Sequence, residues 1–223
     1  MPDHFMNLVV CTDLPNDGIN ELIESTLAHF RSLNIRKLTW LAEEGVLAAE
    51  IKNHLLADRS TFSESFSREM AADLMALPED LPLPTGLEIV PVDNGETLRQ
   101  WIHVASIGFD VLEEYEKVWY DFFVEAVFDP PFRTYLALLD GVPVGTSQLF
   151  LSAGVAGIYN VTCIPEARGQ GIGAAITLAP SLAARGMGYR IAILQASDLG
   201  ARVYRRLGFQ DFGKRCVYLW ENG

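Results

Sequence analysis

The spacing of apolar and polar residues predicts an alternation of strands and helices in the first third of the chain. Short apolar runs favour strands, and apolar positions three and four residues apart favour helices. The predicted elements are strands at 8–11, 36–41 and 62–74, and helices at about 17–34 and 47–56. We therefore expect residues 1–77 to form a small α/β domain. This part of the sequence contains no glycine loop and no nucleophile with a partner residue.

The same criteria predict a longer series of elements from residue 87 onward. An acidic and aromatic stretch, 111–128, has helical spacing, and its aromatic residues are expected mostly in the core, with a few walling a ligand cleft. Asp140-Gly141 separates two apolar runs and predicts a hairpin. The predicted strands are 87–92, 133–139, 142–151, 157–164, 189–194 and 209–220, and the predicted helices are 94–107, 111–128, one starting near 172, and 198–207. This order predicts a mixed, mostly antiparallel sheet with helices on both faces.

Two proline positions bear on where the elements end. Three prolines between 78 and 86 favour an extended linker, since proline cannot donate a backbone hydrogen bond. We therefore predict an N-terminal domain at 1–77, a linker at 78–86 and a second domain at 87–223. Pro180 lies about nine residues into the helix that follows the glycine turn, so we expect that helix to kink or end there.

The stretch Arg168-Gly-Gln-Gly-Ile-Gly173 joins a predicted strand to a predicted helix. A helix N-terminus has unpaired N–H groups and the positive end of the helix dipole, so it attracts anions. Glycines at such a turn let a phosphate approach the backbone closely. A tight turn without a ligand explains the hexapeptide equally well, because short glycine patterns recur by chance.

The charge distribution narrows the class of ligand. The formal net charge of −12 disfavours nucleic acid as a partner, because binding to a phosphate backbone needs a basic face. Residues 160–215 nevertheless contain eight basic and three acidic residues. This local excess suits a small polyphosphate ligand near the glycine turn, although Arg202, Arg205 and Arg206 can equally serve as solvated residues of a helix.

The remaining composition indicates a protein of a reducing compartment. The three cysteines, Cys11, Cys163 and Cys216, are scattered, which favours buried thiols over disulfides or a metal site. The four histidines show no paired spacing, so no metal is expected. No apolar run of about 18 residues and no secretory signal pattern occurs in this sequence, so we expect a cytoplasmic protein without a membrane partner.

Two motifs together resemble the GNAT superfamily of acyl-CoA-dependent N-acyltransferases. Arg168, Gly171 and Gly173, preceded by Pro165-Glu166, match the Arg/Gln-x-x-Gly-x-Gly/Ala motif of that family. Ser197 to Phe209, with Tyr204 and Gly208-Phe209, is similar to the family's helix with a tyrosine before a Gly-Phe pair. The resemblance covers about residues 86–221 and implies the GNAT-like fold. Residues 1–77 resemble a degenerate partial copy of the same fold without the glycine loop.

The resemblance implies acetyl-CoA as cosubstrate and assigns roles to individual residues. Tyr204 is expected to protonate the departing thiolate, as a phenol beside a developing thiolate can. Ser197 stands where the family often has asparagine, and Gly200 replaces the usual alanine. The backbone of the glycine turn is expected to hold the pyrophosphate, and the strand before it to splay from its neighbour and pair with the pantetheine arm. The expected cofactor-binding residues are Val161, Thr162, Cys163, Arg168, Gly169, Gln170, Gly171, Ile172, Gly173, Ala174 and Ser197.

Three functional hypotheses follow from these residues. The first is an N-acetyltransferase that moves an acetyl group to a primary amine of a small molecule or peptide by direct attack. The second is an acyl-CoA-binding regulatory module without turnover, motivated by the lack of an identifiable general base. The third, a dinucleotide-binding unit, is disfavoured because Arg190 stands where an acidic ribose ligand is needed. Neither the acceptor nor the choice between monomer and homodimer is determined by the sequence.

Overall fold

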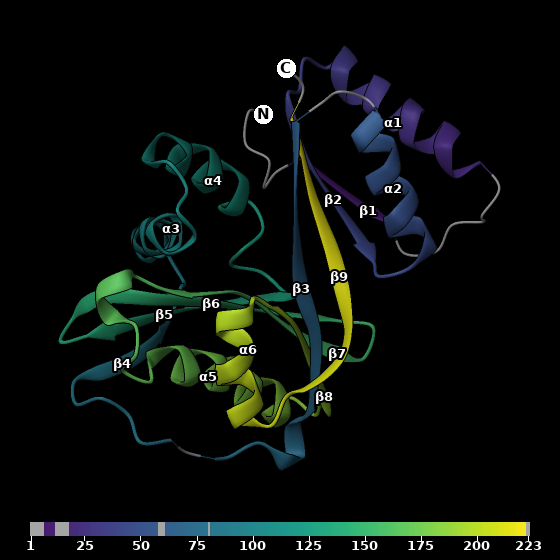
Figure 1. Ribbon diagram of the computed structural model, residues 1–223. Coiled ribbons are helices and arrows are strands. Elements are labelled where there is room, and N and C mark those ends of the chain that lie inside the picture. Colours follow the sequence, from purple (N-terminus) through teal and green to yellow (C-terminus); the bar gives the residue numbers. More distant parts are fainter. Residues whose placement is uncertain (1–6, 12–17, 58–60, 80, 222–223) are drawn as a thin grey trace. The chain divides into compact units, whose positions relative to one another are not determined.

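The fold was analysed in a computed structural model that describes residues 7–11, 18–57, 61–79 and 81–221 (Figure 1). Contacts divide the chain into a terminal unit, residues 1–69 and 212–223, and a central unit, residues 70–211. Hydrogen bonds order the described strands as β1-β2-β9-β3-β8-β7-β6-β5-β4. The expected mixed, mostly antiparallel GNAT-like sheet with helices is thus confirmed.

The terminal unit contains two helices packed on a short sheet. Its elements are β1 (Leu8–Cys11), α1 (Ile19–Ser32), β2 (Lys37–Glu43), α2 (Val46–Ala57), most of β3 (Thr61–Asp73) and most of β9 (Gln210–Glu221). Strand β2 pairs parallel with β1 and antiparallel with β9. Apolar residues of α1 and α2 form one core with Trp40 of β2 and Trp220 of β9, so both helices contribute to covering these strands.

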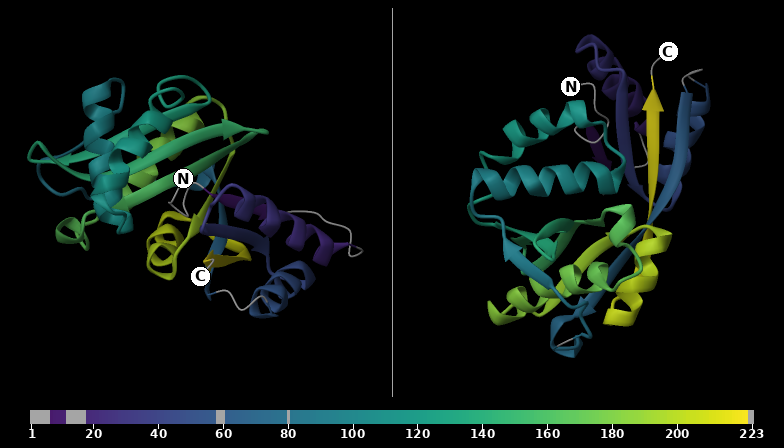
Figure 2. Two further views of the ribbon diagram at one scale, coloured as in Figure 1. Left: turned by 90° about the horizontal axis from the view of Figure 1, so that it is seen from above. Right: turned by 90° about the vertical axis from the view of Figure 1, so that its left-hand side faces the viewer.

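The central unit contains the predicted glycine turn and its neighbouring elements. Its elements are η1 (Leu74–Ala76), β4 (Leu87–Pro91), α3 (Gly95–Phe109), η2 (Glu113–Tyr115), α4 (Glu116–Phe123), β5 (Phe132–Leu139), β6 (Val142–Ser152), β7 (Val155–Cys163), η3 (Pro165–Ala167), α5 (Ile172–Gly186), β8 (Ile191–Ala196) and α6 (Asp198–Leu207). Strands β4 to β7 are antiparallel, and β7 and β8 are parallel. Helices α3 and α4 lie on one side of this sheet, and α5 and α6 lie on the other (Figures 1 and 2).

Two tight turns connect the antiparallel strands of the central unit, one of them at the predicted Asp140-Gly141. Asp140 and Gly141 have φ angles of 50° and 79°, and Ala153 and Gly154 have 50° and 78°. Two successive positive φ angles are typical of the type I′ hairpin turn, whose twist matches that of the strands. The hairpins β5–β6 and β6–β7 are therefore set by local chemistry.

The final strand is grouped differently from the predicted domain boundaries. β9 pairs with β2 from Lys37↔Glu221 to Glu43↔Arg215, so residues 212–223 belong with residues 1–69. The spacing of apolar residues predicts a strand here, but it does not say which strand it pairs with. The separate domains at 1–77 and 87–223, joined by a linker at 78–86, remain a prediction about how the chain is organised.

Two helices differ in length from the sequence expectation. The stretch 111–128 is helical only from Glu116 to Phe123, after a 3-10 turn. Helix α5 does not end at Pro180 but continues to Gly186. Burial of Ile176, Pro180 and Ser181 along α5 stabilises it beyond the proline, and the Ser181 hydroxyl donates to the Thr177 carbonyl at 2.8 Å. In the described residues, no helix combines the length and apolar character needed to cross a membrane.

Candidate active site

The glycine turn between β7 and α5 has a backbone that glycine favours. Gly169 and Gly171 have φ angles of 78° and 86°, which residues with a Cβ rarely adopt. Gly171 is the N-cap of α5, and the next residue, Ile172, is buried and anchors the helix start. A Cβ added at Gly169 or Gly173 would meet no atom within 4 Å, so open space adjoins the turn.

The first turn of α5 directs backbone donors toward that open space. Ala174 and Ala175 both donate to the Gly171 carbonyl at 3.1 Å. The amides of Ile172 and Gly173 precede these bonds, and helix geometry supplies no partner within the helix for them. The first turn carries no acidic side chain. The turn therefore combines free N–H groups with the positive end of a helix dipole, which suits an anion such as a phosphate.

Strands β7 and β8 separate toward the C-terminal end of β7, where the glycine turn begins. Their parallel pairing runs from Val155↔Ile191 to Gly157↔Ile193 and stops there, although β7 continues to Cys163. Ile164 donates to the Val144 carbonyl on β6 at 3.0 Å. Because backbone groups alternate along a strand, Val161 and Cys163 turn theirs away from β6, toward the edge that β8 leaves. An extended ligand can add to that edge as a further strand would.

Thr162, predicted among the cofactor-binding residues, has a different environment from its neighbours. It is paired with Thr146 of β6, and its side chain lies against Gly108 in the last turn of α3. A Cβ on Gly108 would come within 2.3 Å of the Thr162 hydroxyl oxygen, so only glycine fits there. The side chain of Thr162 thus holds α3 against β7 and does not share the open edge.

Arg168 also connects these elements through its side chain. Its Nε donates to the Cys163 carbonyl at 3.1 Å, and its Nη2 donates to the Gly108 carbonyl at 3.2 Å. The guanidinium group therefore links the end of β7 to the end of α3. Arg168 is at the predicted site, but its side chain is occupied by two backbone carbonyls.

Asn160 forms a β-bulge that the sequence analysis missed. The β6–β7 register shifts between Thr146↔Thr162 and Gln148↔Tyr159, so that Asn160 and Val161 together face Ser147. Asn160 has a φ angle of 52°, a left-handed conformation that costs about 1–2 kcal/mol for a residue other than glycine. Asparagine tolerates this conformation better than most residues do, and that preference was the available sequence signal.

Tyr204 is buried on α6, where it packs closely with its neighbours. Its ring centroid lies 6.1 Å from that of Phe209, and a Cβ on Gly200 would come within 3.0 Å of the Tyr204 ring. Burial, with a smaller contribution from the nearby Cys163, raises the pKa of Tyr204 to about 12, while the Thr177 hydroxyl acts in the opposite direction. Tyr204 is therefore a neutral phenol at physiological pH and carries a proton that it can donate.

Cys163 is close enough to Tyr204 to affect its pKa, and it is itself neutral. Burial raises the pKa of the Cys163 thiol to about 11, against a smaller opposing effect of Arg168. Since the thiolate is the nucleophilic form of cysteine, Cys163 is poorly suited to attack an acyl group.

Ser197 caps α6, the helix that carries Tyr204. Its Oγ accepts a hydrogen bond from the Gly200 N–H at 3.2 Å. This bond uses Oγ as an acceptor and leaves the hydroxyl proton available to a further partner. Among the predicted residues, Ser197 thus has a structural role whether or not it contacts a ligand.

Ion pairs neutralise part of the predicted basic patch. Arg185, Arg190, Arg205 and Arg215 pair with Glu79, Asp73, Asp211 and Glu69, respectively. Of these acidic residues only Asp211 lies within the stretch 160–215. Glu79, Asp73 and Glu69 therefore offset part of the local excess of positive charge, and the glycine turn offers an anion its backbone donors.

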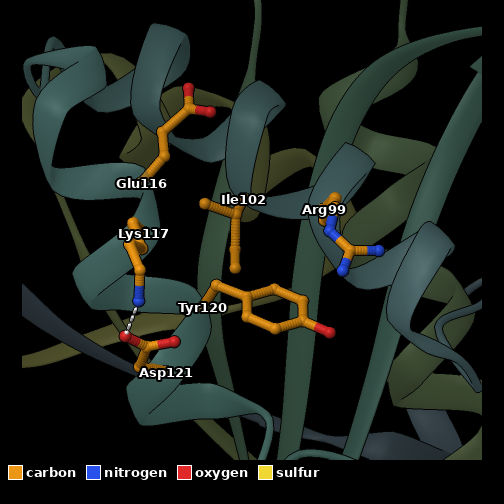
Figure 3. Close-up of a pocket in the computed structure, with 6 residues that line it drawn as sticks. All are labelled: Arg99, Ile102, Glu116, Lys117, Tyr120 and Asp121. Atoms are coloured by element: carbon orange, nitrogen blue, oxygen red, sulfur yellow. Dashed lines mark hydrogen bonds and ion pairs between the residues drawn. The ribbon is translucent and has the colours of Figure 1, made fainter.

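A pocket of about 400 Å³ lies between α3 and α4. It is lined by Arg99, Ile102, Glu116, Lys117, Tyr120 and Asp121. Figure 3 shows Tyr120 and Ile102 between Arg99 and the ion pair of Lys117 with Asp121. The pocket contains none of the predicted cofactor-binding residues, and several of its walls come from the acidic, aromatic stretch 111–128. It is therefore a feature of the α3–α4 side, separate from the glycine turn.

Comparisons with known proteins identify the family. A sequence model of the acetyltransferase (GNAT) family matches residues 96–209. No curated protein matches the chain. A GCN5-related N-acetyltransferase from Kribbella flavida is similar in structure, with a TM-score of 0.71 at 21% identity, over 97% of this chain and 81% of that one. A functionally unknown conserved protein from Staphylococcus epidermidis has a TM-score of 0.75 at 17% identity, over 99% and 87%.

A third similar structure also extends over most of this chain. It is described as a tandem GNAT protein from the clavulanic acid biosynthesis pathway, and its TM-score is 0.64 at 17% identity, over 94% of this chain and 72% of that one. Likenesses at this level of identity establish the fold, while the family match covers half of the sequence and includes both the glycine turn and Tyr204. This chain belongs to the acetyltransferase (GNAT) family.

Proposed function

We propose that this protein is an N-acetyltransferase that transfers an acetyl group from acetyl-CoA to a primary amine by direct attack. The observation that carries the proposal is the parting of β7 from β8 next to a glycine turn with open space around it. An unpaired strand edge and a helix N-terminus side by side suit a ligand with an extended amide arm and a pyrophosphate. Coenzyme A has both, so the residues present fit this cosubstrate.

The residues divide the binding task by chemistry. The backbone groups of Val161 and the N–H of Cys163 are available to the amides of the pantetheine arm, while the Cys163 carbonyl already accepts a hydrogen bond from Arg168 Nε. The amides of Ile172 and Gly173, with Gly169, Gln170 and Ala174 around them, are available to the pyrophosphate. The Arg168 side chain keeps the end of β7 next to the turn. Bound acetyl-CoA would supply the activated acetyl thioester.

The transfer itself requires one bond to form, one to break and one proton to reach sulfur. The amine lone pair attacks the thioester carbonyl, the C–N bond forms, and the C–S bond breaks. Tyr204 donates its phenolic proton to the departing thiolate. The amine loses a proton to solvent, and Tyr204 regains a proton from solvent. A phenol with a pKa of about 12 donates uphill to an ordinary thiol. Burial narrows the difference, because it raises thiol pKa values, as at Cys163.

The acceptor is proposed to be a cationic amine of a small molecule or peptide. Glu113 and Glu114 are exposed at η2 and carry this proposal, whereas Glu116 and Asp121 of the α3–α4 pocket are matched there by Arg99 and Lys117. Carboxylates favour the approach of a positively charged amine, which must then lose its proton before it attacks. Glu116 Oε1 already accepts a hydrogen bond from the Ser106 hydroxyl at 2.5 Å and lies 3.0 Å from His103 Nδ1, so we assign it no role as general base.

The test combines acetyl-CoA binding with turnover. Purified protein is titrated calorimetrically with acetyl-CoA, and thiol release is then measured over a panel of polyamines, amino acids, amino sugars and peptides. We expect release well above slow hydrolysis with at least one amine. Tyr204→Phe retains the buried ring and should lower kcat by about 10- to 100-fold through loss of the proton donor, with binding unchanged.

Two outcomes would contradict the proposal at different points. Tight binding of acetyl-CoA without release on any amine would indicate a regulatory binding module. Full kcat in Tyr204→Phe, with a productive amine, would remove the proton-donor role and leave the transferase proposal standing.

A further inference from the structure

A chain of three polar side chains crosses neighbouring strands inside the central unit. Gln148 Nε2 on β6 donates to Thr134 Oγ1 on β5 at 3.1 Å, and Asn160 Nδ2 on β7 donates to Gln148 Oε1 at 3.1 Å. Thr134 and Gln148 are each only 3% exposed. Their strand neighbours Tyr135 and Leu149 pack into the core that includes Leu178 of α5. By alternation, Thr134 and Gln148 lie on the opposite face, toward α3.

Buried polar groups are costly to keep unless they are hydrogen-bonded, and apolar residues of the same size would fill this space. Both polar atoms of the Gln148 amide form hydrogen bonds, Nε2 with the Thr134 hydroxyl and Oε1 with the Asn160 amide. These two bonds fix the orientation of the Gln148 side chain. Gln148 thus has a defined task, which is to hold the Asn160 side chain.

Asn160 is held at its backbone as well. The Thr146 hydroxyl donates to the Asn160 carbonyl at 2.7 Å. Two side chains of β6 therefore fix a residue of β7 whose φ angle of 52° is less favourable for asparagine than for glycine. Side chains of the neighbouring strand β6 thus stabilise the bulge. Thr146 contacts the Asn160 backbone, and Gln148 contacts the Asn160 side chain.

The bulge decides which residues of β7 face its open edge. The extra residue shifts the alternation by one position between Tyr159 and Thr162. Without it, a register continuing from Gln148↔Tyr159 would pair Val161 with Thr146 and turn the backbone of Thr162 outward. A shift of one residue inverts every later position of a strand. The presence of Val161 and Cys163 at the edge beside β8 thus depends on the conformation of Asn160.

We propose that Gln148 is a positioning residue for acyl transfer: it holds Asn160 in the left-handed conformation and so directs the backbone groups of Val161 and Cys163 to the cosubstrate edge. This inference rests on the proposed function, since it names the residue that prepares the same edge for acetyl-CoA. Gln148 itself touches neither substrate, and it acts through Asn160.

The test places glycine at position 160, where it can adopt the left-handed conformation without the hydrogen bond from Gln148. Gln148→Met keeps the volume and removes both hydrogen bonds. Asn160→Gly allows the left-handed backbone without any side-chain partner. For each single variant and the double variant, acetyl-CoA affinity is measured by calorimetry. Their kcat and KM values with the best amine and their melting temperatures are measured as well. Thr39→Val, at a buried threonine of β2 in the terminal unit, serves as the control for loss of stability alone.

We expect Gln148→Met to weaken acetyl-CoA binding or lower kcat at least tenfold. The double variant should return to within about threefold of Asn160→Gly, because glycine no longer needs the hold. Thr39→Val should lower the melting temperature and leave both constants unchanged. An equally large loss in the double variant would show a packing role and overturn the inference, as would wild-type behaviour of Gln148→Met.

The inference and the proposed function can fail separately. If the wild-type protein binds acetyl-CoA but turns over no amine, the binding constants of the wild-type protein and the four variants still decide the role of Gln148. If the wild-type protein does not bind acetyl-CoA, both the inference and the proposed function are overturned.

Discussion

The two units contain the same strand–helix–strand arrangement with different outcomes. In the terminal unit, β1, α1 and β2 form a parallel pair with a helix between them, and in the central unit β7, α5 and β8 do the same. Strand β1 pairs with β2 along its whole length, whereas β7 pairs with β8 over only its first residues. One arrangement is closed, and the other leaves a strand edge open to a ligand.

The starts of the two helices differ in a related way. Both α1 and α5 have a left-handed glycine at the N-cap, Gly18 with a φ angle of 95° and Gly171 with 86°, followed by a buried isoleucine. The first turn of α1 contains Glu21, and the first turn of α5 contains no acidic residue. A carboxylate in the first turn favours the helix but opposes an external anion. The same backbone thus serves for structure in one unit and suits ligand binding in the other.

The largest effect is expected from giving α5 the acidic first turn of α1. Gly173→Glu adds a carboxylate where a Cβ has open space, so the fold should be kept. The carboxylate should compete for the free amides and repel the pyrophosphate, and we expect acetyl-CoA affinity to fall at least 100-fold in calorimetry. Gly173→Gln is the neutral control of equal size and should lose about tenfold. Similar losses in both variants would mean that bulk, and not charge, excludes the ligand.

A second contrast concerns the buried tyrosines, Tyr204 in the central unit and Tyr218 in the terminal unit. The hydroxyl of Tyr218 donates to the Ala48 carbonyl at 2.9 Å, and burial raises its pKa as well. The pKa of Tyr204 rises from 10.0 to about 12, so its contribution to stability is fully present below pH 10 and is lost as the pH rises through 12.

Unfolding in urea at pH 8 and pH 11 measures this contribution. At pH 11 we expect wild-type protein to have lost about 1.4 kcal/mol through Tyr204, and Tyr204→Phe to lack that part of the loss. Tyr218→Phe, the matched variant, should also cost about 1 kcal/mol at pH 8, because its hydroxyl bond to the backbone is removed. An identical pH dependence in wild type and Tyr204→Phe would contradict the shifted pKa.

The smallest effects should come from the two N-cap glycines. Gly18→Ala and Gly171→Ala each place a Cβ on a left-handed residue, and each should lower the free energy of unfolding by about 1 kcal/mol. Only Gly171→Ala should also weaken acetyl-CoA binding, by a few-fold, because only that turn is proposed to hold the cosubstrate. Equal binding in both variants would place the anion site elsewhere.

Local sequence was sufficient for much of the fold and part of the site. The order of strands and helices, the turn at Asp140-Gly141 and the glycine turn at 168–173 depend on short-range preferences for backbone angles. The same applies to the start of α6, since Ser197 is a favoured N-cap residue. These features involve residues that are neighbours in the chain, so their patterns can be recognised without knowing the fold.

Only the tertiary structure decided which distant residues meet. Several contacts join parts of the chain that are far apart in the sequence. They are the pairing of β9 with β2, the ion pairs of Arg185 with Glu79 and of Arg190 with Asp73, and the hydrogen bond of Arg168 to the Gly108 carbonyl. The bulge at Asn160 depends on Gln148 and Thr146 of another strand. Such contacts follow from strand register and packing, which short-range preferences do not specify, and they determine which groups of β7 face the open edge.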